Sequence, residues 1–166
     1  MPEITDAKKL FVHQLGEALN MERTVLGMLK SNEQTASEPK LKQLFAHHRD
    51  ETEGQIRNLE QAFSSLGEKA AGHTCYAMDG MKKESQDLVE KSAAELVDGV
   101  LAGGATHVEH YEIATYQGLL TKAEAMGADD IAALLQENLE QEQHTLTEVQ
   151  QVGESLSRRT AQQIRA

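Results

Sequence analysis

The chain has 166 residues and a formal net charge of −11, from 16 basic and 27 acidic residues. An acidic surface argues against partners such as nucleic acid or anionic membranes, and it tolerates metal cations. No apolar run reaches about 18 residues and the N-terminal stretch lacks a signal peptide's apolar core, so we expect a cytoplasmic protein with no membrane contact.

Two long helices are expected in the first half of the single domain that we assign to residues 1–166. Apolar residues recur at helical spacing over residues 5–30, and the stretch SNEQTASEPK ends that helix. Ser37 is the expected N-cap of the second helix, with Pro39 in its first turn. This helix should run to about residue 66, with Gly67 as its C-cap.

The second half predicts a short helix and two further long ones. The stretch CYAMDGMKKESQDLVEKS, residues 75–92, favours a short connecting helix. A third long helix is expected over residues 93–126, in which the Gly103–Gly104 pair allows a kink or a close helix neighbour. The fourth should cover residues 129–156. With no strand pattern, the sequence predicts an all-α, antiparallel four-helix bundle with a short extra helix between helices two and three.

Every long helix carries acidic residues on the face that its apolar residues predict to be buried. They are Glu22 in the first helix, Glu51 in the second, Glu109 and Glu112 in the third, and Glu142 in the fourth. Residues three or four apart share a helix face. A buried, unpaired carboxylate is costly and needs a partner or a proton. For Glu22 alone, an error in the phase of the stripe is the simpler explanation. Glu51 and Glu142 lie in charged stretches, where a solvated face is the default. Glu109 with Glu112 fits a solvated edge of the stripe as well as a buried site.

The acids also fall at matching levels along the helices. In an antiparallel hairpin, residues equidistant from the turn face each other. The midpoint of residues 22 and 51 lies at the turn before Pro39, and the midpoint of residues 112 and 142 is Gly127. The two halves therefore resemble a loose repeat of one helical hairpin, and each half is expected to contribute half of a site.

Carboxylates that converge in a core need positive charge, and no Lys or Arg lies on these stripes. Two divalent metal ions would supply it, because oxygen-rich sites with an imidazole or two suit iron or manganese. His48, one turn before Glu51, is either a ligand, a hydrogen-bond partner of a ligand, or a satisfied core histidine. Tyr116, one turn after Glu112, either packs in the core, bonds a ligand carboxylate or takes part in redox chemistry.

Five stretches carry a resemblance to a known family: MER, HRDETEGQI, CYAMDGM, VEHYEIATY and LEQEQ. In this order and spacing, over roughly residues 5–155, they resemble the YciE/YciF family of bacterial ferritin-like stress proteins. The resemblance implies a ferritin-like four-helix bundle, a homodimer, a dinuclear metal site and an association with stress responses. The metal ligands that it implies are Glu22, His48, Glu51, Glu109, Glu112 and Glu142.

The Glu109/Glu112 pair also resembles the paired glutamates of rubrerythrin-type peroxidases. The sequence departs from the rubrerythrin and ferritin pattern in two helices. Thr52 and Gln55 stand where helix two should have Glu-x-x-His, and Thr145 replaces the histidine of helix four. These departures bear on the number of ligands, on the metal and on any oxidase activity.

Three functional hypotheses follow. The first is a dimetal carboxylate protein acting in oxidative or general stress, with iron as the preferred metal and manganese as the alternative. Two Fe(II) ions bridged by Glu51 and Glu142 would react with peroxide or oxygen, as in a di-iron oxidase or peroxidase. The second is a non-catalytic structural or partner-binding bundle with a vestigial metal site. The third, iron storage, requires a hollow shell, and the sequence gives no indication of one.

Overall fold

The computed structural model describes residues 3–164 and contains two helical hairpins. Helices α1 (Ala7–Thr35) and α2 (Pro39–Ser65) form the first. Asp6 caps α1, because its carboxylate accepts a hydrogen bond from the backbone N–H of Lys9 at 2.8 Å. The connection then contains α3 (Tyr76–Lys91) and a single 3₁₀ turn, η1 (Ala94–Leu96).

Helices α4 (Val97–Ala125) and α5 (Asp129–Ile164) form the second hairpin. The chain leaves α2 and α4 through Gly67 (φ 72°) and Gly127 (φ 67°), in the left-handed conformation that favours glycine. Both positions agree with the helix ends expected from the sequence. Helix α4 runs without a break through Gly103 and Gly104.

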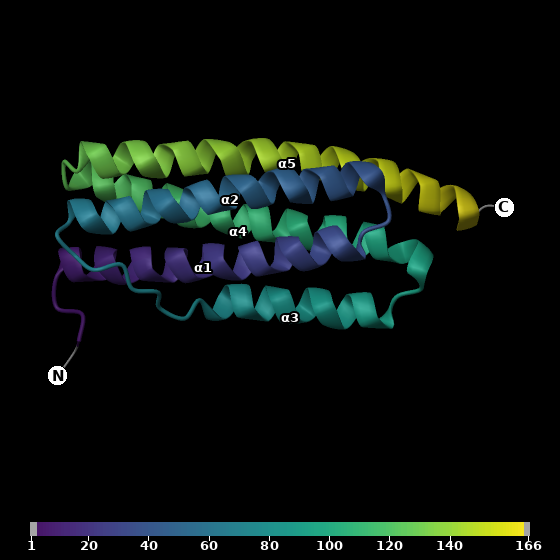
Figure 1. Cartoon of the computed structure of the whole chain (residues 1–166), viewed down its shortest axis with the longest axis horizontal. Coiled ribbons are helices and arrows are strands. Elements are labelled where there is room, and N and C mark those ends of the chain that lie inside the picture. Colours follow the sequence, from purple (N-terminus) through teal and green to yellow (C-terminus); the bar gives the residue numbers. More distant parts are fainter. Residues whose placement is uncertain (1–2, 165–166) are drawn as a thin grey trace.

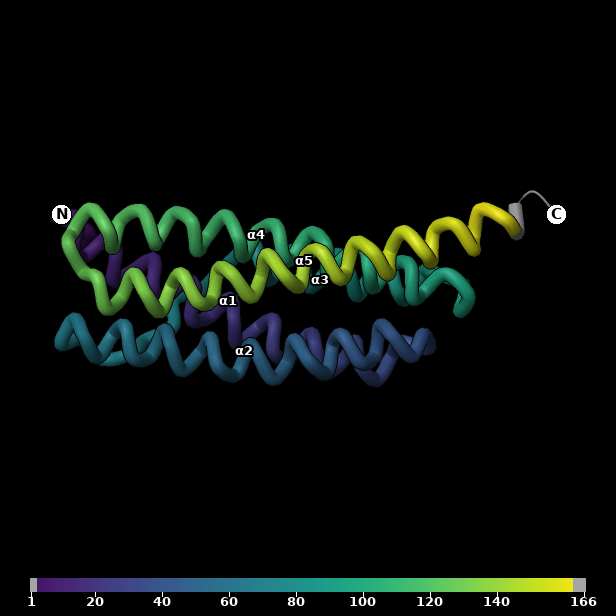
Figure 2. Tube along the Cα trace, turned by 90° about the horizontal axis from the view of Figure 1, so that it is seen from above, coloured from purple at the N-terminus to yellow at the C-terminus, as the bar shows by residue number. Residues whose placement is uncertain are grey.

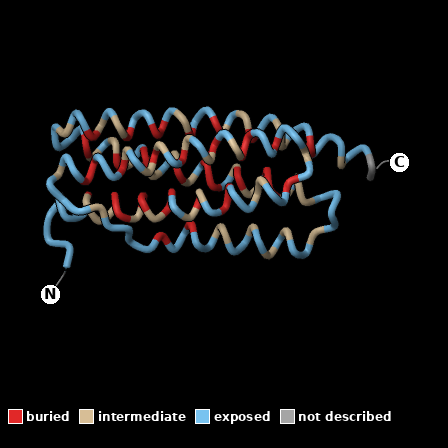
Figure 3. The backbone as a smooth tube through the Cα atoms, in the orientation of Figure 1, coloured by how far each residue is buried: buried red, intermediate tan, exposed pale blue. Residues whose placement is uncertain are grey.

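The two hairpins pack side by side, and each long helix runs antiparallel to its neighbours (Figures 1 and 2). Helix α3 lies outside the bundle against α1 and α4, and Met78 is its one buried residue among those described. Buried residues line the interior between the four long helices (Figure 3). The all-α four-helix bundle with a short extra helix in the crossing connection is thus confirmed. Over residues 3–164, no helix is both long enough and apolar enough to cross a bilayer.

The turn between α1 and α2 corrects the sequence analysis in two ways. Helix α1 continues five residues past the expected end, to Thr35, and Ser37 is not an N-cap. Instead Asp98, at the start of α4, accepts hydrogen bonds from the backbone N–H groups of Ser37 (2.7 Å) and Glu38 (3.0 Å). The cap of α2 therefore comes from a residue about sixty positions away, which no local pattern reveals.

Helix α5 also extends further than expected, to Ile164 rather than to residue 156. Its last turns project beyond the other helices (Figures 1 and 2). Arg159 in this extension donates a hydrogen bond to the carboxylate of Glu38 at 2.5 Å. This contact ties the extension to the start of α2.

The segment between α2 and α3 crosses α1 closely at Gly16. The backbone N–H of His73 donates to the carbonyl of Gly16 at 2.9 Å. A Cβ at position 16 would collide with the His73 ring and lie 2.7 Å from the carbonyl oxygen of Ala71. Only glycine fits under this crossing.

We therefore expect Gly16→Ala to destabilise the protein by roughly 1–3 kcal/mol, because the crossing segment must move. Gly27→Ala is the matched control, since it lies in the same helix and its Cβ would meet nothing within 4 Å. It should stabilise the helix by roughly 0.5–1 kcal/mol. Urea unfolding of both variants measures the difference, and equal effects would contradict the close crossing.

Candidate metal centre

Three helices bring four potential metal ligands together in the middle of the bundle. They are His48 from α2, Glu109 and Glu112 from α4, and Glu142 from α5, all buried. One ligand atom from each lies within 4.8 Å of the others. Glu109 and Glu112 converge because residues three apart on a helix share a face. The structure thus gathers four of the six residues that the resemblance implies.

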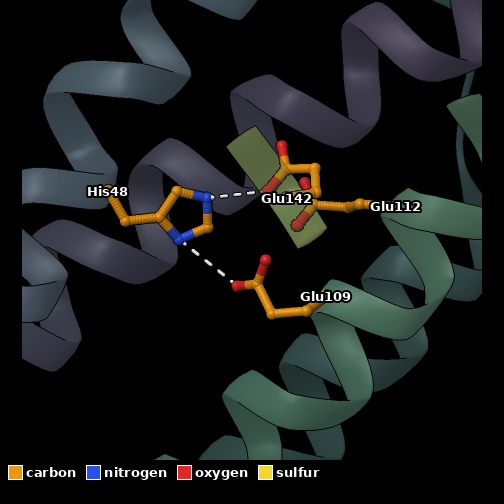
Figure 4. Close-up of side chains that lie close together, drawn as sticks. All are labelled: His48, Glu109, Glu112 and Glu142. Atoms are coloured by element: carbon orange, nitrogen blue, oxygen red, sulfur yellow. Dashed lines mark hydrogen bonds and ion pairs between the residues drawn. The ribbon is translucent and has the colours of Figure 1, made fainter. Parts of the chain in front are cut away.

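The His48 ring lies between two of these carboxylates (Figure 4). Its Nε2 atom is 3.1 Å from Oε2 of Glu142, and its Nδ1 atom is 3.3 Å from Oε1 of Glu109. Burial alone would lower the histidine's pKa, but the hydrogen bond to Glu142 and the surrounding carboxylates outweigh it and raise the pKa of His48. With both ring nitrogens facing acids, a protonated His48 is the one local cation that the described side chains supply.

That single positive charge leaves most of the cluster unsatisfied. The carboxylate oxygens that are buried without a hydrogen-bond partner are Oε2 of Glu22, Oε2 of Glu109, both oxygens of Glu112 and Oε1 of Glu142. Among residues 3–162, whose burial is described, no Lys or Arg is buried. Buried oxygen acceptors that lack donors fit hard or borderline divalent cations, so the chemistry of the donor set agrees with a metal centre.

Crowding and loss of water raise the pKa values of the buried acids. Burial, with repulsion from Glu142, raises the pKa of Glu22 to about 8. The same two causes raise the pKa values of Glu109 and Glu112 well above the ordinary range. Without a metal ion, burial therefore favours the protonated forms of these three acids.

Glu22, on α1, is buried but is not one of the four clustered residues, and one of its oxygens is already engaged. The hydroxyl of Tyr116 donates a short hydrogen bond to Oε1 of Glu22, while Oε2 has no partner. The sequence left three roles open for Tyr116: core packing, a hydrogen bond to a carboxylate, or redox chemistry. The structure shows a fully buried Tyr116 side chain that makes the hydrogen bond. Glu22 thus offers one free oxygen to a cation.

Glu51 lies at the edge of the core rather than inside the four-residue cluster. Its side chain is 17% exposed, and it lies 3.4 Å from Nε2 of the exposed His47. The hydroxyl of Thr145 donates to its other oxygen at 3.4 Å. Helix periodicity predicts Glu51 on the buried face of α2, but its side chain is partly exposed to solvent.

Asn138 is a buried polar residue that the sequence analysis missed. It lies on α5, three residues after Leu135 and four before Glu142, so the helical spacing of the stripe could have revealed it. Its side-chain Nδ2 donates to the hydroxyl oxygen of Tyr116 at 3.0 Å and to the backbone carbonyl of Gln55 at 3.3 Å. Asn138 therefore connects α5 with α4 and α2 beside the site.

The chain is similar to a known protein family, to a named bacterial protein and to solved structures. The family described as "Domain of unknown function (DUF892)" matches residues 6–162. Protein YciF of Escherichia coli (strain K12) is 36% identical over 138 residues, which cover 82% of this chain and 83% of that protein.

Solved structures agree with the sequence comparison. The structure of the E. coli stress protein YciF superposes with a TM-score of 0.87 at 32% identity, covering 93% of this chain and 99% of that one. YcfI of Rhodopseudomonas palustris, described as a candidate structural protein, gives a TM-score of 0.87 at 34% identity, with 89% and 95% coverage. A Xanthomonas campestris protein that is 18% identical shares the fold, with a TM-score of 0.78 and coverage of 97% and 100%. This chain belongs to the YciE/YciF family of bacterial ferritin-like stress proteins, the DUF892 family.

Proposed function

We propose that this chain is a ferritin-like metal-binding protein of the bacterial stress response. Its core would hold two divalent cations, iron by preference and manganese as the second choice. One observation carries the proposal: several buried carboxylate oxygens around His48 lack any hydrogen-bond donor, and no buried Lys or Arg balances them in the described part of the chain. The family resemblance supports the stress setting.

Each residue of the site has a distinct part in this proposal. His48, Glu109, Glu112 and Glu142 would hold metal directly, and Oε2 of Glu22 and the carboxylate of Glu51 would complete the two positions. Bound iron would supply redox chemistry toward peroxide or oxygen. Burial excludes bulk water from the acids, and the hydrogen bond from Tyr116 holds Glu22 in place.

A second candidate is a structural bundle without catalysis, in which the acids are a vestigial site. Thr52, Gln55 and Thr145 are buried at positions where ferritin-type sites have ligands. The R. palustris relative is itself described as a candidate structural protein. The two candidates differ in one measurable property, which is metal content.

Protein purified from cells supplied with iron should carry up to two metal ions per chain, because the carboxylates need cations. Elemental analysis of the purified protein measures this. Glu112→Ala and Glu142→Ala should each lose most of the metal, since each removes a buried ligand. Glu137→Ala, an exposed acid on α5, is the matched control and should keep it. The structural candidate would be favoured if, after growth in iron or manganese, the wild type held no more metal than the Glu112→Ala/Glu142→Ala double variant.

We also propose a homodimer, on the family resemblance. Gly104 does not itself favour a partner chain, because α3 already fills its surroundings: a Cβ there would lie 3.1 Å from Oγ of Ser85. Light scattering at micromolar concentration should give twice the 18.3 kDa mass of one chain. A single-chain mass would contradict this proposal and leave the metal site untouched.

A further inference from the structure

The hydrogen bonds beside the site have directions that the structure fixes. The carbonyl oxygen of Gln55 can only accept, so the side-chain atom of Asn138 that faces it must be the amide nitrogen. The opposite end of the same amide agrees, because Oδ1 of Asn138 accepts from Nδ2 of Asn58 at 2.7 Å. A backbone carbonyl and a second amide thus set the orientation of the Asn138 side chain.

This orientation determines where the Tyr116 proton points. The amide nitrogen of Asn138 has a second hydrogen, which it donates to the hydroxyl oxygen of Tyr116 at 3.0 Å. A phenol has one hydrogen, and with its oxygen accepting from Asn138, that hydrogen is directed to Oε1 of Glu22. All three side chains are fully buried, so water does not compete for these bonds.

We propose that Asn138 is a positioning residue of the metal centre, acting through Tyr116 on Glu22. It holds the phenol as a donor to Oε1 of Glu22, so that Oε2 alone is presented to a cation and Tyr116 itself stays out of the coordination sphere. The role rests on the proposed metal-binding function. The Asn138 side chain bonds Tyr116, the Gln55 carbonyl and Asn58 rather than a candidate ligand. Through Tyr116 it would nevertheless control the one ligand that α1 supplies.

The test is a set of Mn(II) titrations of the purified, metal-free protein. Asn138→Leu should weaken Mn(II) binding by roughly 10-fold, the lower end of the loss that follows removal of a direct hydrogen-bond partner of a metal ligand, because Asn138 acts through Tyr116. Asn138→Asp is a near-isosteric second variant in case the first folds poorly. It has no N–H to donate, and should show the same loss. Gln136→Leu removes an exposed amide on the same helix and should bind Mn(II) as the wild type does.

A double-mutant cycle separates positioning from mere structural support. Tyr116→Phe removes the donor to Glu22, so adding Asn138→Leu to it should cost no further Mn(II) affinity. If the losses of Mn(II) affinity in the two single variants add up in the double variant, the positioning role is wrong but the metal site stands. Wild-type Mn(II) affinity in both Asn138 variants would have the same meaning. Absence of Mn(II) and Fe(II) binding by the wild type would overturn the proposed function, and the positioning role with it.

Discussion

Saturating the metal-free protein with Fe(II) or Mn(II) should raise its melting temperature by roughly 5–10 °C, because a ligand at about 100 times its dissociation constant stabilises the folded state by about 2.7 kcal/mol. The buried acids make this gain large, since their free oxygens have no other cation. Anaerobic thermal melts with and without metal measure it.

Glu112 is the residue to change, because it is fully buried and both of its carboxylate oxygens lack a partner. Glu112→Ala should remove most of the metal-dependent gain. Glu112→Met keeps much of the volume, and should also raise the melting temperature of the metal-free protein, because the desolvated acid is gone. Glu137→Met, at an exposed position on α5, should leave the gain intact. Equal melting temperatures of the wild type with and without metal would count against the site.

Without metal, the protein should become less stable as the pH rises from 5 to 8. The pKa of Glu22 is raised from 4.5 to about 8 in the folded state, mainly by burial. The folded chain therefore keeps a proton that the unfolded chain releases, and the stabilisation that is complete below pH 4.5 is lost as the pH approaches 8. At 1.36 kcal/mol per pH unit, the loss from Glu22 alone between pH 5 and 8 is roughly 3–4 kcal/mol.

The other groups of the cluster act in the same direction. The pKa values of Glu109 and Glu112 are also raised by burial, and the raised pKa of His48 means that its contribution too is lost as the pH rises through that value. Urea unfolding in the presence of a chelator, at intervals between pH 5 and 8, measures the slope.

Two comparisons make the pH experiment specific. Glu22→Gln should reduce the slope, because the amide does not titrate while Glu109, Glu112 and His48 still do, whereas Glu137→Gln should not change it. With saturating metal the slope should reverse, since metal binding releases the protons and is favoured at higher pH. A stability that stays level or rises between pH 5 and 8 in the metal-free wild type would show that the acids are solvated.

The sequence by itself determined the architecture and the side of each helix that carries the site. Periodicity identifies the buried stripe and the acids that interrupt it. Four of these five acids are buried, and Glu51 is partly exposed. Glycines that must adopt positive φ marked the ends of α2 and α4. These features are local, or follow from the symmetry of an antiparallel hairpin, so one sequence is enough to find them.

The tertiary structure alone decided which of these residues meet. An apolar helical stripe spans about 100° or more, so the pattern alone does not distinguish Glu112 in its centre from Glu51 at its margin. How deeply each acid is buried depends on how its helix is rotated against the neighbouring helices. The Asp98 cap of α2 and the Asn138–Tyr116–Glu22 chain join residues 22 to 94 positions apart. Their hydrogen bonds exist only because packing brings four helices within reach of one another, which is a property of the assembled bundle and not of any segment in it.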